Sequence, residues 1–174
     1  MKIIEFLKKR KYNTCSFKER VTLLRKKGIE IGDDCEIYPD VNFGSEPFLI
    51  EIGNHVRITS GVKITTHDGG LWVLRNKKEF KNADKFGKVK IGNNVHIGID
   101  SIIMPGVTIG DNVVIGCKSV VTKDIPSNVV AAGVPARVIE TIDKYKEKVE
   151  NKVVFTKGMS SEEKKEYLIK HYDI

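Results

Sequence analysis

The stretch VKIGNNVHIGIDSIIMPGVTIGDNVVIGCKSVV, residues 89–121, places an aliphatic side chain at every sixth position from Ile91 to Val121. Two earlier blocks repeat this spacing, one with Ile52, Ile58 and Ile64, the other with Ile31, Ile37 and Phe43. A period of six is neither the roughly 3.6 residues of a helix nor the two residues of an ordinary strand. It fits a coil with three flat faces, since hexapeptide repeats are a signature of parallel β-helix solenoids. The spacing therefore predicts an all-β solenoid.

Small polar residues recur three positions after each aliphatic one. Eight of these eleven positions are Gly, Asn or Asp, and the full set is Asp34, Asp40, His55, Gly61, His67, Asn94, Asp100, Gly106, Asn112, Lys118 and Asp124. Such residues tolerate a positive φ best, because Gly lacks a Cβ and short polar side chains bond locally. This second pattern predicts left-handed corners between the faces.

The bulk composition indicates an ordinary globular protein. A chain of 174 residues, 40% hydrophobic and 30% charged, suits one domain with small appendages. No apolar run approaches the roughly 20 residues that span a bilayer, and Met1–Lys11 lacks the features of a secretion signal. Cys15, Cys35 and Cys117 are too few and too widely spaced for a disulfide framework or a metal knuckle. We expect a cytoplasmic location with structural cysteines.

The net charge of +7 comes from the N-terminus, because residues 1–28 alone have a balance of +8. Residues 1–28 hold ten Lys and Arg against two Glu, whereas residues 29–139 hold twelve basic and thirteen acidic residues. No nucleic-acid-reading motif accompanies the basic segment, so no nucleic-acid partner is expected. A solvated helix face explains the charge, and weak association with an anionic membrane surface or a lipid-linked phosphate is the alternative.

These patterns divide the chain into segments. Residues 1–28 are expected to form short helices that cap the open end of the solenoid. Residues 29–139 form the solenoid, and residues 68–88 interrupt its period and should protrude as a loop on the binding face. Residues 140–174 are expected to form a helical extension, with a capping box in the SSEE sequence at 160–163.

Four motifs resemble those of the hexapeptide-repeat acyltransferases, most closely the galactoside, maltose and capsule or lipopolysaccharide O-acetyltransferases. They are IGNNVHIG at 91–98, MPGVTIGDN at 104–112, SVVTKDIP at 119–126 and AGVPARVI at 132–139. The resemblance covers roughly residues 29–139. It implies a left-handed parallel β-helix, an exception to the right-handed crossover rule. It also implies a homotrimer with active sites between subunits, acetyl-CoA as the acyl donor and a sugar hydroxyl as the acceptor.

The resemblance places the catalytic base on His67, within the sequence ITTHDGG at residues 64–70. An imidazole can take the proton of a poorly nucleophilic sugar hydroxyl as the hydroxyl attacks the thioester. The same position also belongs to the corner pattern, where a histidine with positive φ would be structural. Asp68 is a candidate for orienting the imidazole, or is equally a turn residue. Trp72 and Arg75 are candidates for stacking on the acceptor sugar and binding an anionic group of it.

For the donor, the resemblance implies coenzyme A contacts at Ile99, Cys117, Thr122, Lys123 and Arg137. Arg137 would meet the phosphates, since a guanidinium suits their geometry. Two positions depart from the family pattern. His96 stands where a tryptophan often lines the acceptor cleft, and Glu140 stands where a second arginine is common. His96 is expected on the acceptor side.

Other functional classes stay open on the sequence. A γ-carbonic anhydrase shares the solenoid but needs three converging histidines for zinc. The four histidines are not at that family's close spacing, so no metal is expected. A non-catalytic scaffold, an N-acetyltransferase of an amino sugar and a xenobiotic acetyltransferase are the remaining alternatives. The function we expect is acetyl-CoA-dependent O-acetylation of a sugar hydroxyl, in a surface polysaccharide or its precursor.

Overall fold

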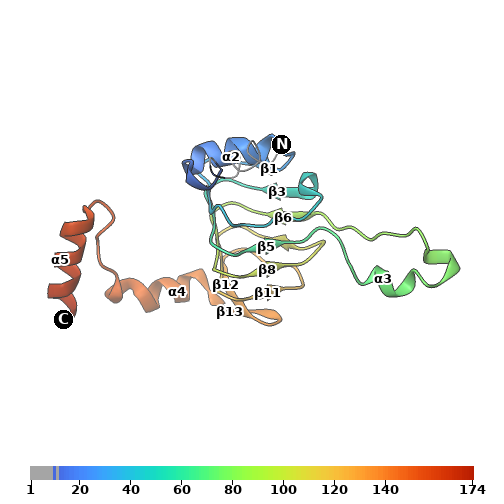
Figure 1. Ribbon diagram of the computed structural model, residues 1–174. Coiled ribbons are helices and arrows are strands. Elements are labelled where there is room, and N and C mark those ends of the chain that lie inside the picture. Colours follow the sequence, from blue (N-terminus) through green and yellow to red (C-terminus); the bar gives the residue numbers. More distant parts are fainter. Residues whose placement is uncertain (1–9, 11) are drawn as a thin grey trace. The chain divides into compact units, whose positions relative to one another are not determined.

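The structure is a computed structural model that describes residue 10 and residues 12–174. The chain divides into two compact units, one ending at Asp143 and the other running from Lys144 to Ile174. The first unit consists of coils stacked in register around one aliphatic core (Figure 1). No helix in the described part of the chain is long and apolar enough to cross a membrane.

Short strands from successive coils pair into three sheets. Sheet A contains β1 (Glu30–Ile31), β3 (Ile50–Ile52), β6 (Val89–Ile91) and β9 (Thr108–Ile109). Sheet B contains β2 (Glu36–Ile37), β4 (Val56–Ile58), β7 (Val95–Ile97), β10 (Val113–Ile115), β12 (Val129–Gly133) and β13 (Ala136–Thr141). Sheet C contains β5 (Lys63–Ile64), β8 (Ile102–Ile103) and β11 (Val120–Val121). Apart from the antiparallel hairpin of β12 and β13, the pairing is parallel. The predicted left-handed parallel β-helix is confirmed.

Aliphatic side chains at equivalent positions stack into columns inside the coils. In sheet B, Ile58 pairs with Ile97 and Ile97 pairs with Ile115, and all three residues are fully buried. Each coil thus extends the same core by one layer, and each fully buried aliphatic side chain contributes about 1.5–3 kcal/mol. The core positions predicted from the six-residue period are buried in all three sheets.

Eight of the eleven predicted corners have a positive φ, at Asp34, His55, Gly61, Asn94, Asp100, Gly106, Asn112 and Lys118. The corner prediction is wrong at Asp40, His67 and Asp124, which do not adopt a positive φ. Asp40 and Asp124 use their carboxylates instead, accepting from backbone N–H groups of neighbouring coils. Their donors are Gly61 at 3.1 Å and Thr108 at 2.8 Å, respectively. His67 departs from the pattern because the chain leaves the solenoid there.

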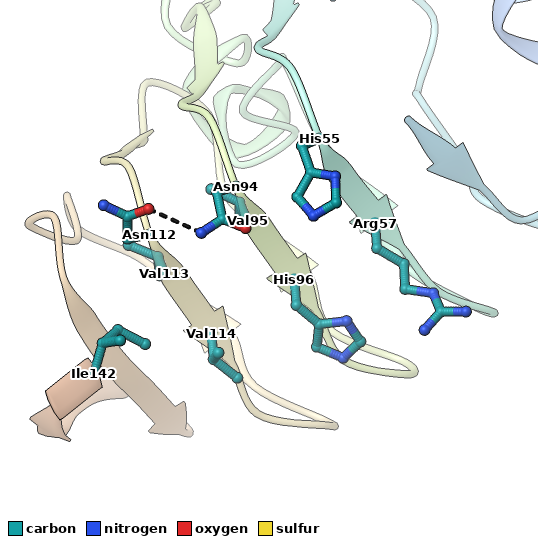
Figure 2. A pocket seen from close by; sticks show the side chains of 9 residues that line it. All are labelled: His55, Arg57, Asn94, Val95, His96, Asn112, Val113, Val114 and Ile142. Atoms are coloured by element: carbon teal, nitrogen blue, oxygen red, sulfur yellow. Dashed lines mark hydrogen bonds between the residues drawn. The ribbon is translucent and has the colours of Figure 1, made fainter. Parts of the chain in front are cut away.

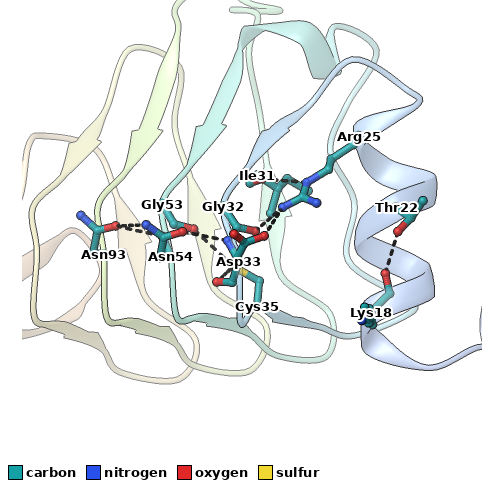
Figure 3. Close-up of polar contacts among 10 residues, drawn as sticks. All are labelled: Lys18, Thr22, Arg25, Ile31, Gly32, Asp33, Cys35, Gly53, Asn54 and Asn93. Atoms are coloured by element: carbon teal, nitrogen blue, oxygen red, sulfur yellow. Dashed lines mark hydrogen bonds and ion pairs between the residues drawn. The ribbon is translucent and has the colours of Figure 1, made fainter.

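Coils approach each other too closely at one corner for a side chain to fit. A Cβ on Gly92 would lie 2.8 Å from the carbonyl carbon of Gly110. Amide side chains beside this corner join the coils (Figure 3). Asn54 Oδ1 accepts from the backbone N–H of Asp33 at 2.8 Å, and Asn93 Oδ1 accepts from that of Asn54 at 2.9 Å. The glycines and amides therefore keep successive coils in register.

Helix α2 (Phe17–Arg25) packs against the first coil. Its buried face includes Leu24 and the charged Arg20, which is 3% exposed and donates to the carbonyl of Ile37 at 2.9 Å. Arg25 Nε donates to the carbonyl of Ile31 at 2.8 Å (Figure 3). The helix expected before α2 lies largely outside the described residues, as do four of the ten basic residues of the segment 1–28.

Two excursions interrupt the coils. Residues 65–88 leave between β5 and β6 as an arm that carries α3 (Leu71–Leu74) and the 3-10 helix η2 (Lys78–Phe80) (Figure 1). A shorter excursion, residues 44–49, precedes β3 and contains η1 (Pro47–Leu49).

The C-terminal part of the chain is helical. It contains α4 (Ile142–Val149), η3 (Glu150–Lys152) and α5 (Ser161–Tyr172). Ser160 accepts from the Glu163 backbone, and the Glu163 side chain accepts from the Ser160 backbone at 2.7 Å. The predicted capping box is confirmed.

Candidate active site

His67 lies where the chain leaves sheet C for the arm. Strand β5 ends at Ile64, and His67 forms an antiparallel bridge with Phe86 on the returning side of the arm. The carbonyl of Thr66 accepts from Gly87 N at 2.8 Å on the same short ribbon. This ribbon, and not a coil corner, sets the backbone of His67. Its side chain is 48% exposed, so a substrate can reach it.

Glu46 is the carboxylate that meets the imidazole. Its Oε2 lies 3.2 Å from His67 Nδ1 and accepts from the hydroxyl of Thr66 at 2.9 Å. Thr66 is fully buried, so its hydroxyl holds the carboxylate in place. A hydrogen bond with Ser45, and then those with Thr66 and His67, lower the pKa of the Glu46 carboxyl. An ionised carboxylate here favours the tautomer with Nδ1–H, which leaves Nε2 as the nitrogen that can take a proton.

Sequence patterns did not single out Glu46. The only signal in its segment is a small departure from the six-residue period. Phe43 and Ile52, two successive core positions, are nine residues apart instead of six. The three extra residues belong to the excursion at 44–49 that carries Glu46.

A cavity of about 360 Å³ opens beside His67. Residues that line it come from the short excursion and from the arm: Ser45, Glu46, His67, Asp68, Gly69, Trp72, Arg75, Asp84, Lys85 and Phe86. Trp72 is 75% exposed and Phe86 is 51% exposed, so both rings can offer a face to a ligand. The structure thus brings together four of the predicted site residues, namely His67, Asp68, Trp72 and Arg75.

Ion pairs hold the charged side chains of the arm. Asp68 accepts from Lys85 Nζ at 3.0 Å and from the N–H of Gly70 at 3.0 Å. Lys85, and then Gly70, lower the pKa of the Asp68 carboxyl. Glu46, and not Asp68, contacts the imidazole, while Asp68 ties the two sides of the arm together. Arg75 pairs with Asp84, the residue next to Lys85.

His96 lies on another surface, the outer face of sheet B (Figure 2). A groove of about 240 Å³ runs there, lined in part by Arg57 of β4 and Val114 of β10. Burial, and then the nearby Arg57, lower the pKa of His96, so its imidazole is neutral at pH 7. His55 lines the same groove, but among the described residues no three His, Cys, Asp or Glu side chains are arranged to hold a metal ion. Within one chain, His96 does not line the cavity of His67.

The five predicted coenzyme A positions lie on exposed edges of the later coils. Ile99 and Cys117 follow paired strands and occupy the same corner of successive coils. Thr122 and Lys123 directly follow β11, and Arg137 lies on β13, all three exposed. None of the five lines the cavity of His67.

Several known proteins are similar to this chain in sequence. Residues 88–123 match the family described as Bacterial transferase hexapeptide (six repeats). Protein CapG of Staphylococcus aureus is 51% identical over 151 residues, which cover 86% of this chain and 87% of CapG. Galactoside O-acetyltransferase of Escherichia coli (strain K12) is 36% identical over 145 residues, which cover 72% of this chain and 70% of that enzyme.

Solved structures share its fold. A maltose O-acetyltransferase from Clostridium difficile 630 superposes with a TM-score of 0.53 at 37% identity, covering 76% of this chain and 81% of the other. A galactoside acetyltransferase in complex with coenzyme A gives a TM-score of 0.51 at 32% identity, with 80% and 79% coverage. Identity and coverage at these levels, together with the stacked hexapeptide coils, show that the chain belongs to the hexapeptide-repeat acetyltransferases.

Proposed function

We propose that the protein transfers the acetyl group of acetyl-CoA to a hydroxyl of a sugar, with His67 as the general base. The observation that carries this proposal is the contact of 3.2 Å between His67 Nδ1 and Glu46, beside a cavity with the exposed ring of Trp72. The relatives add support, because several are named O-acetyltransferases of sugars and one was solved with coenzyme A. Three free cysteines suit a reducing, cytoplasmic site of action.

The proposed reaction needs one proton to move twice. His67 Nε2 takes the proton of the acceptor hydroxyl as the oxygen attacks the thioester carbonyl. The imidazolium formed is stabilised by the carboxylate of Glu46, which accepts from Nδ1–H. When the tetrahedral intermediate collapses, the carbon–sulfur bond breaks and His67 returns the proton to the thiolate of coenzyme A. The products are the acetyl ester and free coenzyme A.

For the donor, we propose contacts at Ile99, Cys117, Thr122, Lys123 and Arg137. Their exposure on the later coils leaves them accessible to a long ligand, and Arg137 can pair with its phosphates. They lie outside the cavity of His67, as does His96. We propose that a complete site combines residues from two copies of the chain, in a homotrimer with sites between subunits.

Mixing two impaired variants at a limiting concentration of acetyl-CoA tests this arrangement. His67→Ala should remove the base, and Arg137→Ala should weaken donor binding. If each site combines residues from two chains, a refolded mixture regains activity, because some sites receive both intact halves. Recovery of no activity in a mixture that forms mixed trimers contradicts shared sites.

The decisive assay measures release of coenzyme A from acetyl-CoA across neutral sugars, amino sugars and streptogramin-type antibiotics. We expect release with sugars that offer only hydroxyl groups. His67→Ala should lower kcat at least about a hundredfold, the usual contribution of a general base, without changing the oligomeric state. His171→Asn, on α5, is the matched control and should leave kcat unchanged. Release only with amino acceptors, or more than a tenth of wild-type kcat in His67→Ala, overturns the proposal.

A further inference from the structure

The cavity beside His67 carries an excess of negative charge. Its lining holds three carboxylates, Glu46, Asp68 and Asp84, but only two permanent cations, Arg75 and Lys85. With the imidazole neutral, the part of the lining that one chain supplies has a formal charge of −1. This is opposite in sign to the net charge of +7 of the whole chain, so the cavity departs from the overall field of the molecule.

Both cations in the cavity are already paired. Arg75 makes an ion pair with Asp84, and its Nε also donates to the carbonyl of Ala83 at 3.2 Å. Lys85 Nζ lies 3.0 Å from Asp68 Oδ2. Each paired carboxylate offsets much of the charge of its cation, so an anionic ligand gains less from either cation than it would from a free one. This pairing argues against the expectation that Arg75 binds an anionic group of the acceptor.

The carboxylate that lacks a permanent cation as its partner, Glu46, is the one that contacts His67. Glu46 contacts the imidazole of His67 and the hydroxyl of Thr66, and no permanent cation is its partner among the contacts of the described residues. A ligand hydroxyl within reach of His67 Nε2 therefore lies in the field of Glu46. A carboxylate or phosphate on the same sugar would be repelled, since like charges at close range disfavour binding.

Apolar surface complements this electrostatic pattern. Trp72 and Phe86 expose 75% and 51% of their surface. The C–H faces of a pyranose ring pack well on aromatic rings, and such stacking requires no ligand charge.

We infer that this cavity selects an acceptor whose reacting pyranose ring is uncharged, and that the Arg75–Asp84 pair enforces the selection against uronic acids and sugar phosphates. The inference rests on the proposed function only in taking the cavity of His67 as the acceptor site. It narrows the acceptor class to neutral glycosides and assigns a specificity role to Asp84, which occupies the arm and lies outside the repeat motifs.

Binding can be measured without turnover, because Trp72 is the single tryptophan of the chain. Methyl galactoside and methyl galacturonide, and the matching glucoside and glucuronide, are titrated while the fluorescence of Trp72 is followed. We expect the uronide of each pair to bind at least about tenfold more weakly, the discrimination that one like charge near the site provides. Equal or tighter binding of the uronides overturns the inference, and so does the absence of any fluorescence change with either ligand.

Asp84→Asn tests the mechanism of selection. It releases Arg75 with little change in side-chain size, so the ratio of uronide to glycoside affinity should rise at least about fivefold. Glu79→Gln is the matched control: it removes an acidic group from the same arm, is exposed and does not line the cavity. An unchanged ratio in Asp84→Asn contradicts the assigned role. If that variant fails to fold, Glu46→Gln removes the carboxylate charge beside His67 instead, and the same rise in the ratio is required.

The two proposals fail separately. Transfer to amino acceptors alone, with glycosides still preferred in the titration, refutes O-acetylation and keeps the charge selection. Transfer to hydroxyl acceptors with equal kcat/KM for glycosides and uronides refutes the charge selection and keeps O-acetylation.

Discussion

Replacing Glu46 with glutamine tests whether this carboxylate positions the catalytic base. The amide keeps the size of the side chain, and its oxygen can still accept from the hydroxyl of Thr66, which lies 2.9 Å from the Glu46 carboxylate in the wild type. It removes the negative charge 3.2 Å from His67 Nδ1. The imidazole becomes positively charged during proton transfer, and an adjacent carboxylate stabilises that cation. We therefore expect kcat to fall while the KM for acetyl-CoA is unchanged.

Solvent exposure of the pair sets the size of this effect. Loss of a buried triad carboxylate lowers kcat about 10⁴-fold, whereas a fully exposed ion pair contributes little. The side chain of Glu46 is 21% exposed and that of His67 is 48% exposed, so the pair lies between these limits. We expect kcat to fall roughly 10- to 100-fold.

Steady-state release of coenzyme A measures the effect, with Glu51→Gln as the matched control. Glu51 pairs with Lys88 and Lys90 on sheet A and does not line the cavity, so kcat should not change. A hydrogen bond with Ser45 is the main cause of the lowered pKa of Glu46, so the carboxylate is lost only as the pH falls through that lowered value. The two kcat values are therefore compared at about pH 8, where the Glu46 carboxylate of the wild type is ionised. A variant within threefold of wild-type kcat, or a change confined to KM, would refute the positioning role.

Three further outcomes test the fold. Gly92→Ala should lower the free energy of unfolding by about 1–3 kcal/mol, because the new Cβ would lie 2.8 Å from the carbonyl carbon of Gly110. Gly69→Ala is the control, since its Cβ would have no atom within 4 Å, and it should lower this free energy far less. Urea unfolding measures both variants. Ile97→Ala removes a fully buried side chain and should cost about 2–5 kcal/mol. Burial, with Arg57, lowers the pKa of His96, so the unfolded state takes up its proton first as the pH falls. The wild type should therefore lose more unfolding free energy than His96→Gln between about pH 8 and 5.5, and equal losses would contradict this.

The solenoid could be predicted because each coil meets the same surroundings as the coil before it. Ile97 pairs with Ile58 on one side and Ile115 on the other, so one local rule is repeated along the chain. The corners could be predicted in the same way wherever a residue with a positive φ makes the turn by itself. The prediction of a positive φ fails at Asp40 and Asp124. There the carboxylate accepts a hydrogen bond from a backbone N–H of a neighbouring coil, so the turn does not need a positive φ.

The candidate site was only half predictable, since its side chains come from segments without a period. His67 could be found through the motif around it, and Trp72 through its place in the interrupting loop. The pairing of Asp68 with Lys85 depends on how the arm folds back, which no spacing in residues 65–88 indicates. Sequence adjacency suggested Asp68 as the partner of the imidazole, but its carboxylate is engaged across the arm.

The stacking of equivalent positions nevertheless indicates which segment contacts His67. Asn42 pairs with Lys63 in parallel, so the chain beyond Phe43 and the chain beyond Ile64 leave the same face in neighbouring coils. A Cβ on Gly44 would lie 3.6 Å from Thr66 Oγ1, which shows how closely the two departures begin. In a solenoid, two insertions that leave neighbouring coils at the same position of the repeat must therefore start side by side. Applied to this sequence, the rule pairs His67 with residues 44–49, and so with Glu46, 21 positions away, rather than with its neighbour Asp68.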